Sequence, residues 1–330
     1  MDSKHTNSVP DWISERFGIG EISSIRDAGG SRNVSFVVET DRGRWIVRRR
    51  YEGYSSPERI AFDHGALRHL TAAGAAVVPP REDVDGNTSW RDEAGLWEVY
   101  PFADGRHLRE GDPNDLRALA EALAQFHEAG RSCNARYDKL GPRGEMDPDH
   151  LLESAGRIRA EDPEIDDALD PYEQAVHKAS KALSLAAWQS LPHTLVHGDV
   201  QPANVLVDGG RVSAFLDLDW CAWRPRVYDL CFAILCCCAM HDQPIGGGDV
   251  WDLTQEPMFD ARLVNDFLRA YESQSERLAD EERAAMPAQT VLNWCHARVD
   301  NALKVPPADR RRFLTRGGEG LLARIEGLWQ

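Results

Sequence analysis

The hydrophobic pattern of the chain changes character near residue 102. Before that point, short runs rich in β-branched and aromatic residues alternate with turn residues, which is typical of antiparallel strands. After it, apolar residues recur every three or four positions, which predicts amphipathic helices. We therefore expect an N-terminal part built around a sheet and a longer, mostly helical C-terminal part.

The N-terminal part is predicted to hold one long helix besides its strands. Apolar positions from Ile60 to Leu70 fall near one face of a helix, which Pro79 and Pro80 end. The predicted strands are Val34–Thr40 and Arg44–Arg49, joined by the turn Asp41–Gly43, and two further runs around Asp85–Asn87, the second ending in Leu96–Phe102.

The C-terminal part is predicted to be a series of helices with one interruption. A strand-and-turn segment spans Thr194–Trp220. Asp112 and Asn114 are both candidates for the cap of the first helix. The predicted helices are Leu116–His127, Leu151–Arg159, Tyr172–Leu191, Tyr228–Met240, Ala261–Leu278, Ala288–Leu303 and Arg311–Leu328.

Composition narrows the class of protein. The 330 residues carry 38 Lys and Arg against 54 Asp and Glu, a net charge of −16, so a nucleic-acid partner is not expected. The sequence contains no apolar run of about 18 residues, so a membrane span is not expected. The N-terminus lacks the pattern of a secretory signal peptide. The seven cysteines form no Cys-x-x-Cys pair, and four of them lie in the apolar run Leu230–Met240, which predicts a buried helix. We expect a cytoplasmic protein.

The segment Leu195–Asp219 gathers polar side chains around a predicted hairpin. A turn centred on residues 209–210 places Asn204 opposite Phe215, within two residues of Asp217. Asp217 and Asp219 are two apart, so on a strand they point to the same face. The sequence therefore predicts one cluster of four side chains: Asp199, Asn204, Asp217 and Asp219.

This cluster contains oxygen ligands and no His or Cys, which suits Mg²⁺. Mg²⁺ is usually held by one or two carboxylates together with substrate phosphates, and a further carboxylate can receive a hydroxyl proton. These are the parts needed to transfer a phosphoryl group from a nucleotide to an alcohol. Each of these residues, considered alone, also has a simpler interpretation. Asp199 and Asn204 would then be ordinary turn residues, and Asp217 would be an exposed acidic residue on a strand.

The motif His197-Gly198-Asp199-x-x-Pro202-x-Asn204, followed by Asp217 and by Tyr228-Asp229-Leu230, resembles the aminoglycoside phosphotransferase family. That family includes choline and ethanolamine kinases and type II homoserine kinases. The resemblance implies an α+β, bilobal, protein-kinase-like fold, with a nucleotide-binding lobe over 1–101 and a catalytic, acceptor-binding lobe over 102–330.

The resemblance implies a role for each matched residue. Asp199 is the expected catalytic residue, which orients the acceptor hydroxyl and takes its proton. Asn204 and Asp217 are the expected ligands of Mg²⁺, and Asp219 is a further metal ligand, an acceptor-binding residue or only a strand acid. Asp229 and His197 are expected to support the catalytic loop.

In the first lobe the resemblance points to a nucleotide-binding set. Gly29, Gly30 and Ser31 precede a strand and would let backbone N–H groups approach phosphate oxygens. Arg48 stands where the family has its phosphate-pairing base, although Arg49 and Arg50 follow directly and the register could slip. Its expected partner is Asp63 on the helix. In the predicted hinge, Pro101 would offer its carbonyl, and Ala103 its N–H, to adenine.

The acceptor is expected to contact the second lobe. Trp220 follows the predicted metal strand, and Trp294 and Arg298 share a helix face because they are four residues apart. Most of the acidic excess lies after residue 100, which favours an amine-bearing acceptor. Arg298 would suit the carboxylate of an amino acid.

The sequence therefore favours an ATP- and Mg²⁺-dependent phosphotransferase that acts on a hydroxyl of a small metabolite or antibiotic, in the latter case as a resistance enzyme. It is expected to be a monomer or homodimer. The alternatives are a Ser/Thr protein kinase of the same fold, a non-catalytic nucleotide-binding regulator and a metal-dependent hydrolase. Tyr228 follows Asp217 within eleven residues, which leaves no room for a long activation loop.

Overall fold

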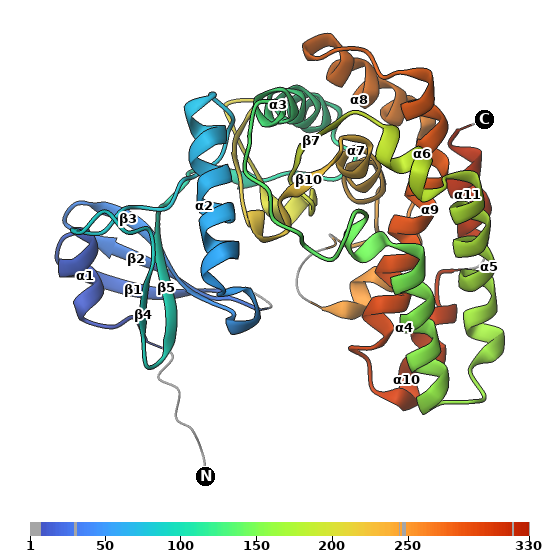
Figure 1. Ribbon diagram of the computed structural model, residues 1–330, viewed down its shortest axis with the longest axis horizontal. Helices are drawn as coiled ribbons and strands as arrows, with labels where there is room; N and C mark the ends of the chain where they lie inside the picture. Colours follow the sequence, from blue (N-terminus) through green and yellow to red (C-terminus); the bar gives the residue numbers. More distant parts are fainter. Residues whose placement is uncertain (1–7, 30–31, 244, 246–248, 319, 330) are drawn as a thin grey trace.

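The computed structural model describes residues 8–29, 32–243, 245, 249–318 and 320–329. A five-stranded sheet lies at one end of the molecule, helix α2 (Pro57–Ala72) beside it, and the C-terminal helices at the other end (Figure 1). The fold is α+β, as the sequence predicts. Within the described residues, no helix combines the length and the apolar character needed to cross a bilayer.

The N-terminal sheet is antiparallel, with strand order β1-β2-β3-β5-β4. Its two faces differ. One packs against the short helix α1 (Trp12–Phe17) and buries an apolar cluster that includes Phe36, Val47 and Trp97. The strands are β1 (Ile22–Gly29), β2 (Val34–Thr40), β3 (Gly43–Arg50), β4 (Trp90–Asp92) and β5 (Gly95–Pro101).

Helix α2 begins as its sequence dictates. Ser56 Oγ accepts a hydrogen bond from Arg59 N, and Pro57 occupies the first turn, where no donor is missed. Phe62, Ala66 and Leu70 then pack into the same large apolar cluster as the C-terminal helices. Helix α2 therefore joins the sheet to the rest of the molecule.

Most predicted C-terminal helices are present; α3, α4 and α9 are longer than the patterns indicate, whereas α7 and α8 end earlier. Asp112 is the cap of α3 and accepts from Asn114 N and Asp115 N. Two predicted helices are each divided: Tyr172–Leu191 into α5 and α6, and Arg311–Leu328 into α10 and α11. The helices are α3 (Pro113–Arg131), α4 (Pro148–Glu161), α5 (Asp166–Ala182), α6 (Leu185–Ser190), α7 (Val227–Ala233), α8 (Ala261–Gln274), α9 (Asp280–Ala302), α10 (Pro307–Thr315) and α11 (Leu321–Gly327).

Short strands interrupt the helices where the sequence predicts them. Two small sheets pair β7 with β10 and align β6, β8 and β9. The cysteine-rich run forms α7 and a π-helical turn at Ile234–Cys238, and all seven cysteines are buried and free. The strands are β6 (Arg106–His107), β7 (His193–Val196), β8 (Val205–Asp208), β9 (Arg211–Phe215) and β10 (Ala222–Pro225).

The N-terminal strand prediction was incomplete. It missed α1, which is only six residues long, and β1, whose apolar residues are few and widely spaced. It also set the last hairpin around Asp85–Asn87, whereas β4 and β5 pair across residues 93–94, because Trp90 lies opposite Trp97 and Asp92 opposite Gly95.

Candidate active site

Asp199 lies in the loop that follows β7, and neighbouring amides hold its carboxylate. Oδ2 accepts from Asn204 Nδ2 at 2.8 Å and from Gln201 Nε2 at 3.0 Å. Burial raises the pKa of Asp199 to about 7, and the negative charge of Asp217 acts in the same direction. This carboxylate can therefore bind or release a proton near neutral pH.

Asp229 on α7 stabilises the loop that carries Asp199 through hydrogen bonds. Its carboxylate accepts from His197 N at 2.6 Å, from Gly198 N at 2.9 Å and from His127 Nε2 at 3.0 Å. Burial acts to raise its pKa, but the hydrogen bond and charge of His127 outweigh it, so the pKa lies below its ordinary value. A buried, ionised Asp229 therefore fixes two consecutive backbone amides.

His197 links this loop to the hairpin. Its Nε2 faces Leu216 O at 2.9 Å, and its Nδ1 accepts from Asp199 N at 3.2 Å. Burial lowers the pKa of His197, which keeps the imidazole neutral. Because both ring nitrogens are engaged by the backbone, these contacts agree with the supporting role expected for His197.

Gly198 is required by a close approach. Its φ is +88°, and a Cβ at this position would lie 2.3 Å from Trp220 O. Trp220 therefore packs directly against the loop that carries Asp199.

Asn204 and Asp217 come together at the base of the hairpin, by a register that differs by one residue from the prediction. A bulge between Leu206 and Val207 places Phe215 opposite Val205. Asn204 O instead accepts from Leu216 N at 2.8 Å, directly beside Asp217. The predicted neighbourhood of Asn204 and Asp217 is therefore present.

Asp217 does not continue a strand. Its φ of 55° is left-handed, which is uncommon for a residue with a Cβ and is most often tolerated by Asn and Asp. Its side chain stays 46% exposed. Partial desolvation of the carboxyl group and the negative charge of the nearby Asp219 raise its pKa to about 6. Strained backbone of this kind is concentrated at functional sites.

Asp219 is placed differently from the prediction. It lies in a 3₁₀ turn, Leu218–Trp220, so the expected shared strand face with Asp217 is wrong. Its carboxylate accepts from Asn33 Nδ2 at 2.8 Å and lies 3.2 Å from Arg48 Nη1 and 3.6 Å from Arg50 Nη2. Burial opposes ionisation, but Arg48 and Arg50 outweigh it and hold the pKa of Asp219 below its ordinary value.

The donors at this site fit a hard cation. Two carboxylates with raised pKa values, Asp199 and Asp217, would be stabilised in their charged forms by a divalent ion. The amide oxygen of Asn204 adds a neutral oxygen ligand, since its Nδ2 is directed at Asp199. Among the described residues, no three His, Cys, Asp or Glu side chains form a complete metal site. Phosphate oxygens and water would have to complete the shell, as is usual for Mg²⁺.

The second face of the N-terminal sheet carries charged residues rather than apolar ones. Arg48 and Arg50 on β3 and Glu98 on β5 point to this face, and Glu98 is fully buried. Glu98 pairs with Arg48 Nη2 at 2.7 Å and with Arg50 Nη1 at 2.9 Å. Burial of Glu98 is outweighed by these two arginines, which hold its pKa well below its ordinary value. We call Arg48, Arg50, Glu98 and Asp219 the arginine layer.

Arg48 is the arginine of this layer that reaches the candidate metal ligands. Its Nη1 lies 3.6 Å from Asp217 Oδ1, and its Nη2 donates to Tyr100 Oη at 3.1 Å. Arg49 alternates to the other face, where its guanidinium lies 5.8 Å from the centre of the Trp97 ring. Of the three consecutive arginines, Arg48 is therefore the one that approaches Asp217, in the register that the family resemblance implies.

The expected pairing of Arg48 with Asp63 is wrong. Among the described residues, Asp63 forms ion pairs with Arg50, Lys139 and Arg59. The side chain of Asp is one methylene shorter than that of Glu, and the nearer Arg50 takes the contact. Glu98 takes the position opposite Arg48 instead.

The predicted phosphate loop lies partly outside the described residues, whereas the predicted hinge lies within them. Gly29 ends β1 with a φ of +76°, whereas Gly30 and Ser31 lie outside the described residues. Phe102 N donates to Arg44 O at 3.1 Å, so Pro101 occupies a non-hydrogen-bonded position and its carbonyl turns away from β3. No hydrogen bond of the described residues engages Ala103 N. The Pro101 carbonyl and the Ala103 N–H, which are expected to contact adenine, therefore form no hydrogen bond with β3 or with other described residues.

Two of the three acceptor predictions are wrong. Trp294 is buried in the large apolar cluster, and Arg298 is fully buried. The Arg298 guanidinium donates to the carbonyls of Phe313, Leu314 and Arg316 at the end of α10, so it is a structural residue. Trp220 is partly exposed and lies beside Tyr54, with ring centres 5.6 Å apart.

Sequence reasoning also missed two buried charged residues. Glu98 interrupts the apolar run Leu96–Phe102, and a lone acid in such a strand is a signal that it has a buried partner. Lys139 carries no such signal. It comes from the loop between α3 and α4, pairs with Asp63, and donates to Asp219 O at 3.0 Å.

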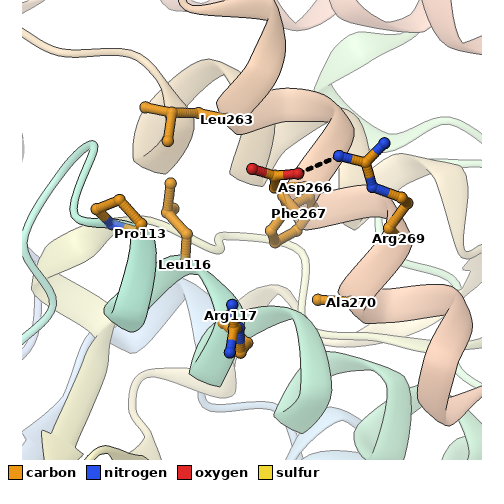
Figure 2. A pocket seen from close by; sticks show the side chains of 8 residues that line it. All are labelled: Pro113, Leu116, Arg117, Leu263, Asp266, Phe267, Arg269 and Ala270. Atoms are coloured by element: carbon orange, nitrogen blue, oxygen red, sulfur yellow. Dashed lines mark hydrogen bonds and ion pairs between the residues drawn. The ribbon is translucent and has the colours of Figure 1, made fainter.

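A separate pocket of about 310 Å³ lies between α3 and α8 (Figure 2). Leu116 and Phe267 contribute apolar side chains to it, and Asp266 pairs with Arg269 at its rim. None of the residues predicted for catalysis, nucleotide or acceptor binding lines this pocket.

The matches with known proteins define the chain as a kinase of small molecules, and its fold agrees with them. The N-terminal part contacts the helical part through Asn33 and Arg48, which approach Asp219 and Asp217. The model of the phosphotransferase enzyme family (APH) matches residues 24–286, and the chain belongs to this family.

The most similar relatives in sequence include homoserine kinases. The chain is 24% identical over 326 residues to the homoserine kinase of Parvibaculum lavamentivorans, covering 93% of each chain. It is 26% identical over 299 residues to that of Granulibacter bethesdensis, covering 88% of this chain and 85% of the relative.

Solved structures show the same fold at lower identity. An amicoumacin kinase in complex with AMP-PNP, Ca²⁺ and Ami matches with a TM-score of 0.68 at 16% identity, covering 94% of this chain and 91% of the other. An aminoglycoside phosphotransferase from Alicyclobacillus acidocaldarius also has a TM-score of 0.68 at 16% identity, with 97% and 96% covered.

Proposed function

We propose that the protein transfers the γ-phosphate of ATP, in the presence of Mg²⁺, to a hydroxyl group of a small amine-bearing acceptor. The observation that carries this proposal is the meeting of Asp199, Asn204 and Asp217 beside Arg48. The names of the relatives support a small-molecule acceptor, and amino acids, amino alcohols and aminoglycosides are the candidate classes.

In the proposed reaction, the acceptor hydroxyl oxygen forms a bond to the γ-phosphorus, while the bond from this phosphorus to the β–γ bridging oxygen breaks and ADP leaves. Asp199 accepts the hydroxyl proton, and its pKa of about 7 suits that task near neutral pH. Asn204 and Asp217 would hold Mg²⁺, which would neutralise charge on the triphosphate. Arg48 would contribute a fork of donors to the same phosphates.

The proposed division of labour follows the two lobes. Residues 1–101 would bind the nucleotide through Gly29, Gly30, Ser31 and Arg48. Pro101 O and Ala103 N would contact adenine at the junction with 102–330, where catalysis and acceptor binding occur. Asp63 would act indirectly, by holding Arg50 in its place within the arginine layer.

Asp219 is better suited to orient Arg48 than to bind the metal. Its carboxylate lies within ion-pair distance of Arg48 and Arg50 and accepts a hydrogen bond from Asn33. A metal ion at Asp219 would have to compete with two arginines. We therefore propose Asn204 and Asp217 as the metal ligands and Asp219 as a positioning residue.

The test is an ADP-release assay with Mg·ATP and one acceptor from each class, with the phosphorylated product identified by mass spectrometry. We expect acceptor-dependent ADP release and a phosphomonoester product. Phosphate release that does not depend on any acceptor would instead indicate a hydrolase.

A further inference from the structure

The carbonyl oxygen of Asp219 accepts hydrogen bonds from two buried cations that come from different parts of the molecule. Arg59 Nη2, on α2, donates to it at 2.7 Å, and Lys139 Nζ, from the loop between α3 and α4, donates at 3.0 Å. The turn Leu218–Trp220 is therefore held through its backbone as well as through the ion pairs of the Asp219 carboxylate. The proposed reaction uses neither of these two cations.

Asp63 on α2 supplies negative charge to both cations. Its Oδ1 pairs with Lys139 Nζ, its Oδ2 lies 3.8 Å from Arg59 Nε, and it also pairs with Arg50. The side chains of Lys139 and Asp63 are only 1% and 3% exposed, so solvent does not screen their ion pair. The acid of α2 is thus linked to the Asp219 turn through Lys139, and to β3 through Arg50.

The backbone of Lys139 is held in place as well. Its carbonyl oxygen accepts from Arg224 Nη2 at 2.6 Å. Arg224 lies on β10 opposite Thr194 of β7, the strand that leads into the loop of Asp199. Lys139 therefore connects three elements: helix α2, the Asp219 turn and the small sheet that precedes the catalytic loop.

A buried ion pair such as Lys139–Asp63 is weak evidence for stability. Removing two charges from water costs free energy that their attraction only partly offsets, and apolar side chains of similar volume are often equally stabilising. The pair does provide direction, which apolar packing does not. Without the ammonium group, the Asp219 carbonyl would keep Arg59 but lose its contact with the loop between α3 and α4.

We propose that Lys139, paired with Asp63, is a positioning residue for phosphoryl transfer, which fixes the Asp219 turn so that Arg48 and Asp217 meet the triphosphate and its metal ion together. This inference rests on the proposed function. The Asp219 carboxylate lies 3.2 Å from Arg48 Nη1, and Asp217 directly precedes the turn. A shift of the turn would therefore displace a phosphate-binding group and a metal ligand at once.

Lys139→Met tests the proposal, because it nearly keeps the length of the side chain and removes its charge. Asp63 retains Arg50 and Arg59 as partners, so we expect a folded protein. We expect kcat with the best acceptor to fall at least about tenfold, since a displacement of about 1 Å can cost about 100-fold in rate. The Mg²⁺ concentration that gives half of the maximal rate should rise severalfold. Wild-type values of both quantities would overturn the proposal.

Arg143→Met is the matched control. Arg143 belongs to the same loop, is also buried, and donates to Leu183 O at the end of α5 at 2.6 Å. We expect this variant to lose stability in thermal unfolding, while kcat and the Mg²⁺ requirement stay within about twofold of the wild type. An equal rise of the Mg²⁺ requirement in both variants would show that Lys139 acts on stability alone, and would overturn the proposal.

Asp63→Asn tests the pair from its other side, since it keeps the shape of the side chain and removes the charge. If Lys139 and Asp63 act as a unit, the loss of kcat in the double variant should be smaller than the product of the two single losses. Losses that multiply would overturn the pairing.

Calorimetric titration with Mg·AMP-PNP gives a readout without turnover. We expect Lys139→Met to bind at least severalfold more weakly than the wild type and Arg143→Met. Equal binding by all three proteins would overturn the inference and leave the proposed function standing. A wild-type protein that phosphorylates no acceptor would overturn the proposed function, while weaker binding by Lys139→Met would still support a positioning role at the nucleotide site.

Discussion

The loop around Asp199 and the arginine layer both border the candidate active site, but they are held in different ways. In the loop, Asp229 and His197 engage backbone groups, and both side chains are buried. In the arginine layer, ion pairs between side chains join Arg48 to Glu98 and Asp219. Backbone contacts fix a loop in one conformation, whereas Arg48 can exchange a carboxylate for a phosphate. Under the proposed function, we therefore expect a rigid loop around Asp199 beside an adjustable phosphate-binding surface at Arg48.

The largest effect is expected from breaking the rigid side of this comparison. Asp229→Ala leaves His127 and the amides of His197 and Gly198 buried without their acceptor. Loss of a buried, charged partner typically costs about 3–5 kcal/mol. We expect the melting temperature to fall sharply and acceptor phosphorylation to be lost.

Asp229→Asn is the control for shape, because it keeps an oxygen acceptor without the charge. We expect it to fold and to retain part of the activity. An Asp229→Ala enzyme with the stability and turnover of the wild type would show that the loop does not depend on this brace.

The adjustable side is tested by two neighbouring arginines. Arg48→Ala removes the guanidinium that approaches Asp217, so we expect the KM for ATP to rise by about 10- to 100-fold, which corresponds to about 1.4–2.8 kcal/mol. Arg49→Ala, from the same strand, points to the opposite face and should change the KM less than twofold. Steady-state kinetics with ATP as the varied substrate measures both, and equal effects would contradict the assignment.

A smaller effect is expected from the acid between the two arginines. Glu98→Gln removes the charge that orients Arg48 and Arg50 while keeping the side-chain shape. We expect a loss of a few degrees in melting temperature and a several-fold rise in the KM for ATP, with kcat little changed. Glu93→Gln, on the exposed turn before β5, is the control. An unchanged KM in Glu98→Gln would mean that Asp219 alone orients Arg48.

The smallest expected effect concerns stability and pH. A carboxyl group whose pKa is raised by folding, from 3.8 to about 7 for Asp199, binds its proton more tightly in the folded state. Its stabilising contribution is complete below its ordinary pKa and is lost as the pH rises to about 7. Asp199→Asn, which does not ionise, should therefore be more stable than the wild type at pH 8.

Thermal unfolding of both proteins without ligands, at pH 5 and pH 8, measures this effect. The advantage of Asp199→Asn should be larger at pH 8 than at pH 5. An advantage that is equal at the two pH values would show that burial does not disfavour the ionised form of Asp199.

Local spacing predicted the neighbourhood of Asn204 and Asp217 well and the long-range contacts poorly. Residues 193–219 are consecutive, so the motif and the turn at Gly209–Gly210 suffice to bring Asn204 near Asp217. The bulge at Leu206 could not be read from the pattern, because it shifts the register by one residue without changing the hydrophobic alternation. The strands of the N-terminal sheet were visible where β-branched residues cluster, and β1 was not, because it is mostly exposed.

The sequence did not predict which residues pair with each other across the molecule. The spacing on α2 identified Asp63 but not its partner, which depends on the reach of a short carboxylate. On α9, the spacing of Trp294 and Arg298 shows a shared face but not whether that face is inside. The interior position follows from packing against α10 and the larger core, which the spacing of residues within α9 does not specify.

Phosphoryl transfer by Asp199→Asn, compared with the wild type under Mg·ATP and the best acceptor, tests the role of this carboxylate most directly. We expect kcat to fall by at least about 10³-fold, within the range that a general base and its positioning contribute, while AMP-PNP binds within twofold of the wild type. Turnover at the wild-type rate in this variant would contradict catalysis by Asp199.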